Sequence, residues 1–98
     1  MTIKTNKEGS VLTVAIEGKL DTRTAPELEE MLKDSLDGIT KLVLDLKELV
    51  YISSAGLRVV VTAEQAMEKQ GEMVIRNVNE DVMNIFEVTG FVDALNIE

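Results

Sequence analysis

The sequence predicts an α/β fold, in which helices pack on a mixed β-sheet of four to five strands. After residue 18, short apolar segments alternate with longer segments whose apolar residues recur at helical spacing. One short segment, residues 42–46, is almost continuously apolar, as expected of a strand covered on both faces in a parallel sheet. The 98 residues suffice for one hydrophobic core, so we expect a single domain over residues 1–98.

The chain is expected to begin with an antiparallel hairpin. Residues 2–5 and 11–17 have the composition of strands, and the segment 6–10 between them is rich in turn-forming residues. Two adjacent strands joined by so short a turn pair in antiparallel orientation.

The first helix is predicted to start near Thr24. Thr24 and Glu27 have the spacing of a capping box, and Pro26 falls in the first turn, where its missing amide costs little. Gly38 is expected to close the helix. The apolar positions at helical spacing, which should face the sheet, are Leu28, Met31, Leu32 and Leu36.

A second helix is predicted over residues 57–70, ending at Gly71. The β-branched run at 58–62 favours a strand when taken alone. The apolar pattern nevertheless continues to Lys69, and a strand of that length is unusual. We therefore interpret the whole segment as a helix.

The remaining segments predict one strand, one helix and a candidate final strand. Residues 73–76 form the strand, and Asn79 supplies the N-cap of a third helix that ends at Gly90. Residues 94–97 are the candidate for a short final strand. Right-handed crossovers would make the centre of the sheet parallel.

A short segment, residues 51–59, sets two hydroxyls and a glycine between a buried strand and a helix. Ser53 and Ser54 precede Gly56 at the predicted start of that helix. A serine there can cap free amides, and a phosphate carried there would meet the positive end of the helix dipole. The segment is therefore a candidate phosphorylation switch.

The residues of this region resemble the signature of STAS domains. The resemblance rests on residues 44–46, Leu49 and 51–57, and it extends to 18–21 and to 88–91. It is strongest to the single-domain anti-sigma factor antagonists of bacterial partner-switching systems. Such proteins bind an anti-sigma factor that is also a serine kinase, and a metal-dependent serine phosphatase restores the unphosphorylated form.

The resemblance implies roles for individual residues. Ser54 corresponds to the phosphorylated serine, with Ser53 as the second candidate, and Ala55 stands where relatives have a hydroxyl. The aspartate matching Asp21 lies beside the phosphorylation site in relatives. The expected partner-binding residues are Asp21, Ser53, Ser54, Ala55, Gly56 and Arg58.

Plainer interpretations of these residues stay open. Ser54 could do no more than cap its helix, and Gly56 could serve close packing between helix and sheet. Asp21 could satisfy backbone amides in the turn before the first helix. Arg58 could engage a phosphate or simply face solvent. Parallel strands should bring Asp21 and Asp45 towards Ser54, although Asp45 could equally cap its own strand end.

The residue inventory argues against an enzyme. The chain has no histidine and no cysteine, which excludes serine-histidine dyads, cysteine nucleophiles and thiolate metal sites. It also lacks a glycine-rich phosphate loop of the GxxxxGK type. We therefore expect no cofactor and no metal.

Charge and hydropathy limit the partners. The net charge of −8 repels nucleic-acid phosphate and anionic lipid, so a role in transcription would act through a protein. No apolar run is long enough for a membrane helix, and we expect a cytoplasmic monomer. The alternative to partner switching is a constitutive STAS subunit of a transporter or scaffold complex, without a phosphorylation cycle.

Overall fold

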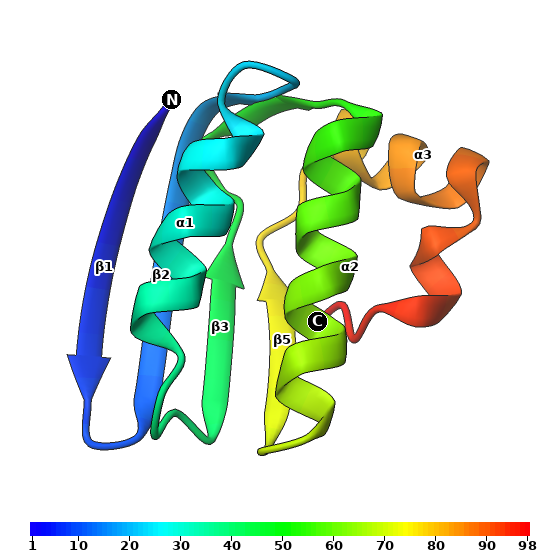
Figure 1. The fold of residues 1–98 in the computed structure, drawn as a ribbon. Helices are drawn as coiled ribbons and strands as arrows, with labels where there is room; N and C mark the ends of the chain where they lie inside the picture. The colour runs from blue at the N-terminus through cyan, green and yellow to red at the C-terminus, as the bar shows by residue number, and fades with distance from the viewer.

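The computed structural model describes residues 1–98 and confirms the α/β fold (Figure 1). The elements are, in chain order, β1 (Thr2–Glu8), β2 (Val11–Leu20), α1 (Ala25–Ser35), β3 (Lys41–Asp45), β4 (Leu49–Ile52), α2 (Ser54–Glu68), β5 (Glu72–Arg76), α3 (Glu80–Thr89) and a 3-10 turn (Phe91–Ala94). No helix combines the length and the apolar character that crossing a membrane requires.

The five strands form a mixed sheet organised around the long strand β2. The order is β1-β2-β3-β5, with β1 antiparallel to β2 and the pairs β2–β3 and β3–β5 parallel. The first half of β2, Val11–Ala15, pairs with β3, and its end, Gly18–Leu20, pairs with β4. Two short strands therefore lie end to end along one long one.

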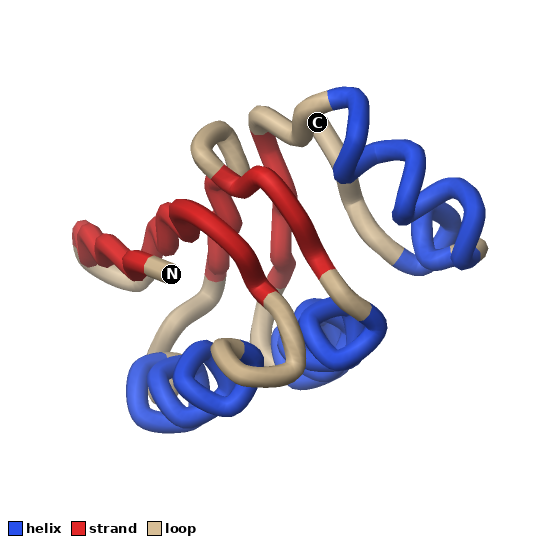
Figure 2. Tube along the Cα trace, turned by 90° about the horizontal axis from the view of Figure 1, so that it is seen from above, coloured by secondary structure: helices blue, strands red, loops and turns tan.

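The helices α1 and α2 cover the same face of the sheet, and α3 lies beside it (Figure 2). A core of 23 buried residues joins the sheet to all three helices, and Phe86 of α3 is its single aromatic ring. The rest of the core is aliphatic or methionine, as a chain with 3% aromatic residues requires. The α3 helix packs against β4 and so anchors the strand that leads into α2.

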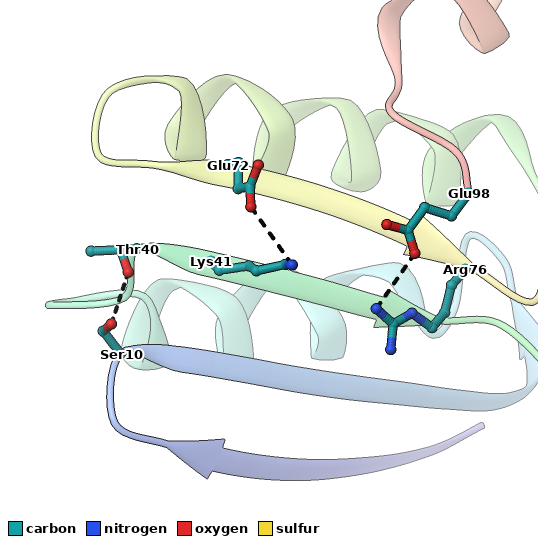
Figure 3. A network of polar contacts seen from close by, with 6 residues as sticks. All are labelled: Ser10, Thr40, Lys41, Glu72, Arg76 and Glu98. Carbon is teal, nitrogen blue, oxygen red and sulfur yellow. Dashed lines mark hydrogen bonds and ion pairs between the residues drawn. The ribbon is translucent and has the colours of Figure 1, made fainter.

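The opposite face of the sheet carries two ion pairs, one between β3 and β5 and one between β5 and the C-terminal residue (Figure 3). Lys41 Nζ lies 3.7 Å from Glu72 Oε1, and Arg76 Nη2 lies 3.5 Å from Glu98 Oε1. Val43 and Val74, which are register partners on β3 and β5, lie between these two ion pairs and are buried. Exposed pairs of this kind contribute ~0.2 to 1 kcal/mol each, so this face is held mainly by the strand pairing.

The predicted hairpin and the three helices are confirmed, with shifted ends. The β-branched run at 58–62 is helical because Val59 and Val60 are buried against the core. The α2 helix begins at Ser54 rather than at Leu57, and the α3 helix has the expected Asn79 cap.

One expectation about strands was wrong, and one strand was missed. Residues 94–97 do not form a strand, because the 3-10 turn at Phe91–Ala94 brings Leu95 into the core and leaves Ile97 as an isolated bridge to Ile75. The strand β4 was not predicted, since its two central residues are exposed and break the period of two.

Candidate functional site

The candidate site lies where the ends of β2 and β4 meet the N-termini of α1 and α2, at the upper edge of Figure 1. Leu20 at the end of β2 is the register partner of Ile52 at the end of β4. The backbone amide of Ser53 donates a hydrogen bond of 2.9 Å to the carbonyl oxygen of Leu20. Asp21 therefore follows directly after the residue that holds the Ser53–Ser54 segment.

Ser53 is the N-cap of α2. Its hydroxyl oxygen accepts a hydrogen bond of 3.3 Å from the amide of Gly56, and its carbonyl oxygen accepts one of 2.9 Å from the amide of Leu57. The backbone of Ser53 is extended, as an N-cap requires. The capping role considered for Ser54 therefore belongs to its neighbour.

Ser54 is the first residue of α2, and its side chain is exposed. The first turn of α2 contains no acidic residue, so no carboxylate of the helix competes for its positive end. Arg58, also exposed, follows four residues later and therefore lies on the same side of the helix. This arrangement is chemically suited to a phosphate on Ser54.

Gly56 lets the start of α2 approach the sheet closely. A Cβ atom at this position would lie 2.8 Å from Cγ and from the carbonyl oxygen of Leu20, and 2.9 Å from Cγ1 of Ile52. Such distances are shorter than packing permits, so the packing interpretation of Gly56 is confirmed. Because Gly56 is buried, its effect on any partner acts through the position of α2.

Asp21 closes the turn before α1, as one of the two interpretations expected. One carboxylate oxygen accepts hydrogen bonds from the amides of Arg23 at 3.0 Å and Thr24 at 3.2 Å. The Thr24 hydroxyl accepts from the Asp21 amide at 2.8 Å and lies 2.9 Å from the Lys19 carbonyl oxygen, to which it donates. The predicted capping box with Glu27 was wrong, because this hydroxyl faces back into the turn and makes no bond to the helix.

The pKa of the Asp21 carboxyl is lowered from its ordinary value. Desolvation by burial acts to raise this pKa, but the hydrogen bonds from Arg23 and Thr24 and the positive charge of Arg23 outweigh it. Asp21 is therefore ionised at neutral pH. The pKa of one other carboxyl is shifted: burial and the negative charge of Glu68 raise the pKa of Glu64. Glu64 lies ten residues after Ser54 on α2, which places it ~15 Å from the site.

Asp45 does not belong to the site, which corrects the expectation that it approaches Ser54. Its register partner on β2 is Ala15, and ~16 Å of strand separates Ala15 from Leu20. Its carboxylate oxygen accepts from the Lys47 amide at 3.1 Å and from Asn77 Nδ2 at 3.0 Å. Asp45 thus caps its own strand end, because β4 occupies the position beside the end of β2.

Two shallow hollows flank the site. One is lined by Asp21 together with Lys19 and Arg23, and the other by Ala55 together with Arg58. Lys19, Arg23 and Arg58 therefore lie around the site together with two acids, Asp21 and Glu29. Lys19 and Arg23 were not predicted as site residues, although their position beside Asp21 in the sequence was a signal for them.

Comparison with known proteins decides the family. The STAS domain model matches residues 2–98. The chain belongs to the STAS domain family.

Relatives of this STAS domain cover nearly its whole length. BtrV of Bordetella bronchiseptica, which carries the provisional name of an anti-sigma factor antagonist, is 38% identical over 99% of this chain and 85% of its own. The anti-sigma-B factor antagonist of Staphylococcus aureus is 30% identical over 99% of this chain and 92% of its own.

Solved structures show the same fold. An anti-sigma factor antagonist from Mycobacterium paratuberculosis superposes with a TM-score of 0.87 at 22% identity, covering 98% of this STAS domain and 83% of that chain. The phosphorylated form of SpoIIAA, a Bacillus cell fate determinant, superposes with a TM-score of 0.77 at 13% identity, covering 99% and 91%.

Proposed function

We propose that this STAS domain is an anti-sigma factor antagonist that switches partners by phosphorylation of Ser54. In the unphosphorylated state it binds an anti-sigma factor that is also a serine kinase, and the sigma factor is released. The observation that carries the proposal is the exposed hydroxyl of Ser54 at the start of α2, with no acidic residue in its helical turn. The names of the relatives that cover the chain, at 38% and 30% identity, support it.

The partner is proposed to bind the edge formed by Asp21, Ser53, Ser54, Ala55 and Arg58, with Gly56 beneath it. Ser54 and Arg58 are exposed, whereas Ser53 and Ala55 are half-buried. Ser54 is therefore the hydroxyl that a kinase reaches, and the hydroxyl of Ser53 is already used in the cap. On this proposal the protein is a substrate of a kinase and a phosphatase, acts in the cytoplasm, is monomeric when free and catalyses no reaction itself.

The physics of the switch separates folding from binding. A phosphate adds about −1.5 to −2 charges at neutral pH. At the N-terminus of α2 the helix dipole stabilises it by ~0.3 to 1 kcal/mol, so the fold tolerates it. At a desolvated interface, like charges brought together cost several kcal/mol, and each ~1.4 kcal/mol is a tenfold loss of affinity. Phosphorylation thus releases the partner without unfolding the protein.

The test is a pull-down from host lysate with wild-type protein, Ser54→Ala and Ser54→Asp, followed by mass spectrometry. We expect an ATP-binding serine kinase with wild type and Ser54→Ala, and its loss with Ser54→Asp at unchanged thermal stability. With ATP, the purified kinase should then phosphorylate wild type and Ser53→Ala but not Ser54→Ala. Retention of the same partners by all three baits, transporter subunits in particular, would contradict the switch and favour a constitutive module.

A further inference from the structure

Strand β4 exposes two large apolar side chains in succession. Val50 is 61% exposed and Tyr51 is 46% exposed, while Leu49 and Ile52 on either side are buried. Side chains of a regular strand alternate between the two faces of a sheet, so two successive exposed residues require an irregularity. The protein has only one other large apolar residue that is comparably exposed, Val88 on α3.

The irregularity is a β-bulge between β2 and β4. Gly18 pairs with Leu49 and the next residue, Lys19, pairs with Tyr51, so Val50 is the extra residue. Gly18 has a φ of 91°, a left-handed conformation that favours glycine, and its amide donates to the Glu48 carbonyl oxygen at 3.0 Å. Bulges are frequent next to functional sites, where they re-aim side chains.

The bulge lies next to the candidate site. Lys19, the register partner of Tyr51, also lines the hollow that contains Asp21. Tyr51 precedes Ser54 by three residues, which places their Cα atoms at most ~11 Å apart. A protein interface buries about 800 Å² on each partner, so an interface centred on Ser54 is large enough to reach β4.

We propose that Val50 and Tyr51 are the apolar anchor by which this protein binds its anti-sigma factor kinase, and that the bulge presents them. The inference rests on the proposed function and adds the chemistry of the contact: the kinase offers an apolar recess, flanked by hydrogen-bond acceptors or acidic groups that face Lys19. Tyrosine is enriched among the residues that dominate binding energy, because its ring has a large apolar area and its hydroxyl can hydrogen-bond.

The experiment measures the dissociation constant for the purified kinase by titration calorimetry. We expect Tyr51→Ala and Val50→Ser each to weaken binding at least about tenfold, while Tyr51→Phe retains most of the affinity. Val88→Ser is the matched control, since Val88 is 87% exposed but lies in the last turn of α3. The affinity of this variant for the kinase should stay within about twofold of wild type. Thermal unfolding of each variant establishes that it is folded.

A second measurement needs no destabilising variant. Tyr51 is the single tyrosine of the chain, so biosynthetic incorporation of 3-fluorotyrosine gives one ¹⁹F resonance that reports on this position. The resonance should shift or broaden when the kinase is added, and it should stay at its free position when the labelled chain carries Ser54→Asp.

The outcomes separate the two proposals. Suppose that the kinase is lost with Ser54→Asp but binds Tyr51→Ala and Val50→Ser as tightly as wild type, and that the ¹⁹F resonance does not move. This result overturns the apolar anchor and leaves the partner switch intact. If Ser54→Asp changes no partner, the proposed function fails, and the anchor fails with it. A wild-type dimer in light scattering that both variants abolish would assign Val50 and Tyr51 to a second copy of the chain and overturn the anchor.

Discussion

The starts of α1 and α2 lie side by side at one edge of the molecule, yet they differ in their capping hydrogen bonds and in the charge of their first turns. Before α1, the carboxylate of Asp21 accepts hydrogen bonds from the amides of Arg23 and Thr24, and Glu27 adds an acid in the first turn. At α2, the hydroxyl of Ser53 accepts a single bond of 3.3 Å, and the first turn has no acid.

The difference lies in the negative charge that the chain itself places at each helix start. The positive N-terminus of α1 is balanced by carboxylates of the chain itself, whereas that of α2 is left for a charge from outside. Ser54, exposed at this second end, is where a phosphate would supply that charge. Substitutions at each helix start therefore test this contrast.

The largest expected effect is that of Gly56→Ala, which pushes the start of α2 away from the sheet. The added Cβ would lie 2.8 Å from the backbone oxygen of Leu20, which belongs to the sheet and cannot move aside easily. We expect a loss of ~1 to 3 kcal/mol in the free energy of unfolding, measured with denaturant. Ser54→Ala, two residues earlier and exposed, is the control and should stay within ~0.5 kcal/mol. Equal stability of both variants would show that α2 is not held by close contact.

A smaller effect is expected from Asp21→Asn at the start of α1. Asparagine can still accept hydrogen bonds but lacks the charge that attracts Arg23, so the melting temperature at neutral pH should fall. Because the pKa of Asp21 is lowered in the folded state, its carboxylate stabilises the fold above the ordinary aspartate pKa of about 4, and this stability is lost as the pH falls through the folded value.

The difference in melting temperature between wild type and Asp21→Asn should therefore shrink as the pH is lowered below about 4. Glu30→Gln, at an exposed position of α1, is the control for removing one negative charge. A difference that is constant from neutral to acid pH would mean that the charge of Asp21 does not matter to the turn.

The smallest effects are expected from Ser53. Ser53→Ala removes a single long hydrogen bond and should cost ~0.5 to 1 kcal/mol, the lower part of the range for N-caps. Ser53→Asp makes the start of α2 resemble that of α1. Its free energy of unfolding should exceed that of Ser53→Ala by more than the contribution of the capping hydrogen bond, since the added negative charge interacts favourably with the helix dipole. Thermal unfolding at low and high salt measures both. An advantage of Ser53→Asp that salt does not reduce would argue against a dipole effect.

Local patterns were good predictors of elements but poorer predictors of neighbours. The Asn79 cap of α3 is confirmed, with its side-chain oxygen 2.9 Å from the Val82 amide, because that bond joins residues only three apart. The Thr24 capping box had the same kind of local signal and was wrong, since the Thr24 hydroxyl found better partners in the turn from Lys19 to Asp21. Competition between local partners cannot be read from spacing alone.

The amino-acid pattern was enough to predict the alternation of strands and helices, a single domain with an aliphatic core, and the serine segment at the start of α2. These features depend on periodicity and capping, which act over a few residues. The pairing of β3 and β4 with successive parts of β2 could be seen only in the three-dimensional fold. This pairing removes Asp45 from the site and exposes Val50 and Tyr51. Strand register depends on contacts between residues far apart in the chain, and a shift of one residue turns a side chain to the other face.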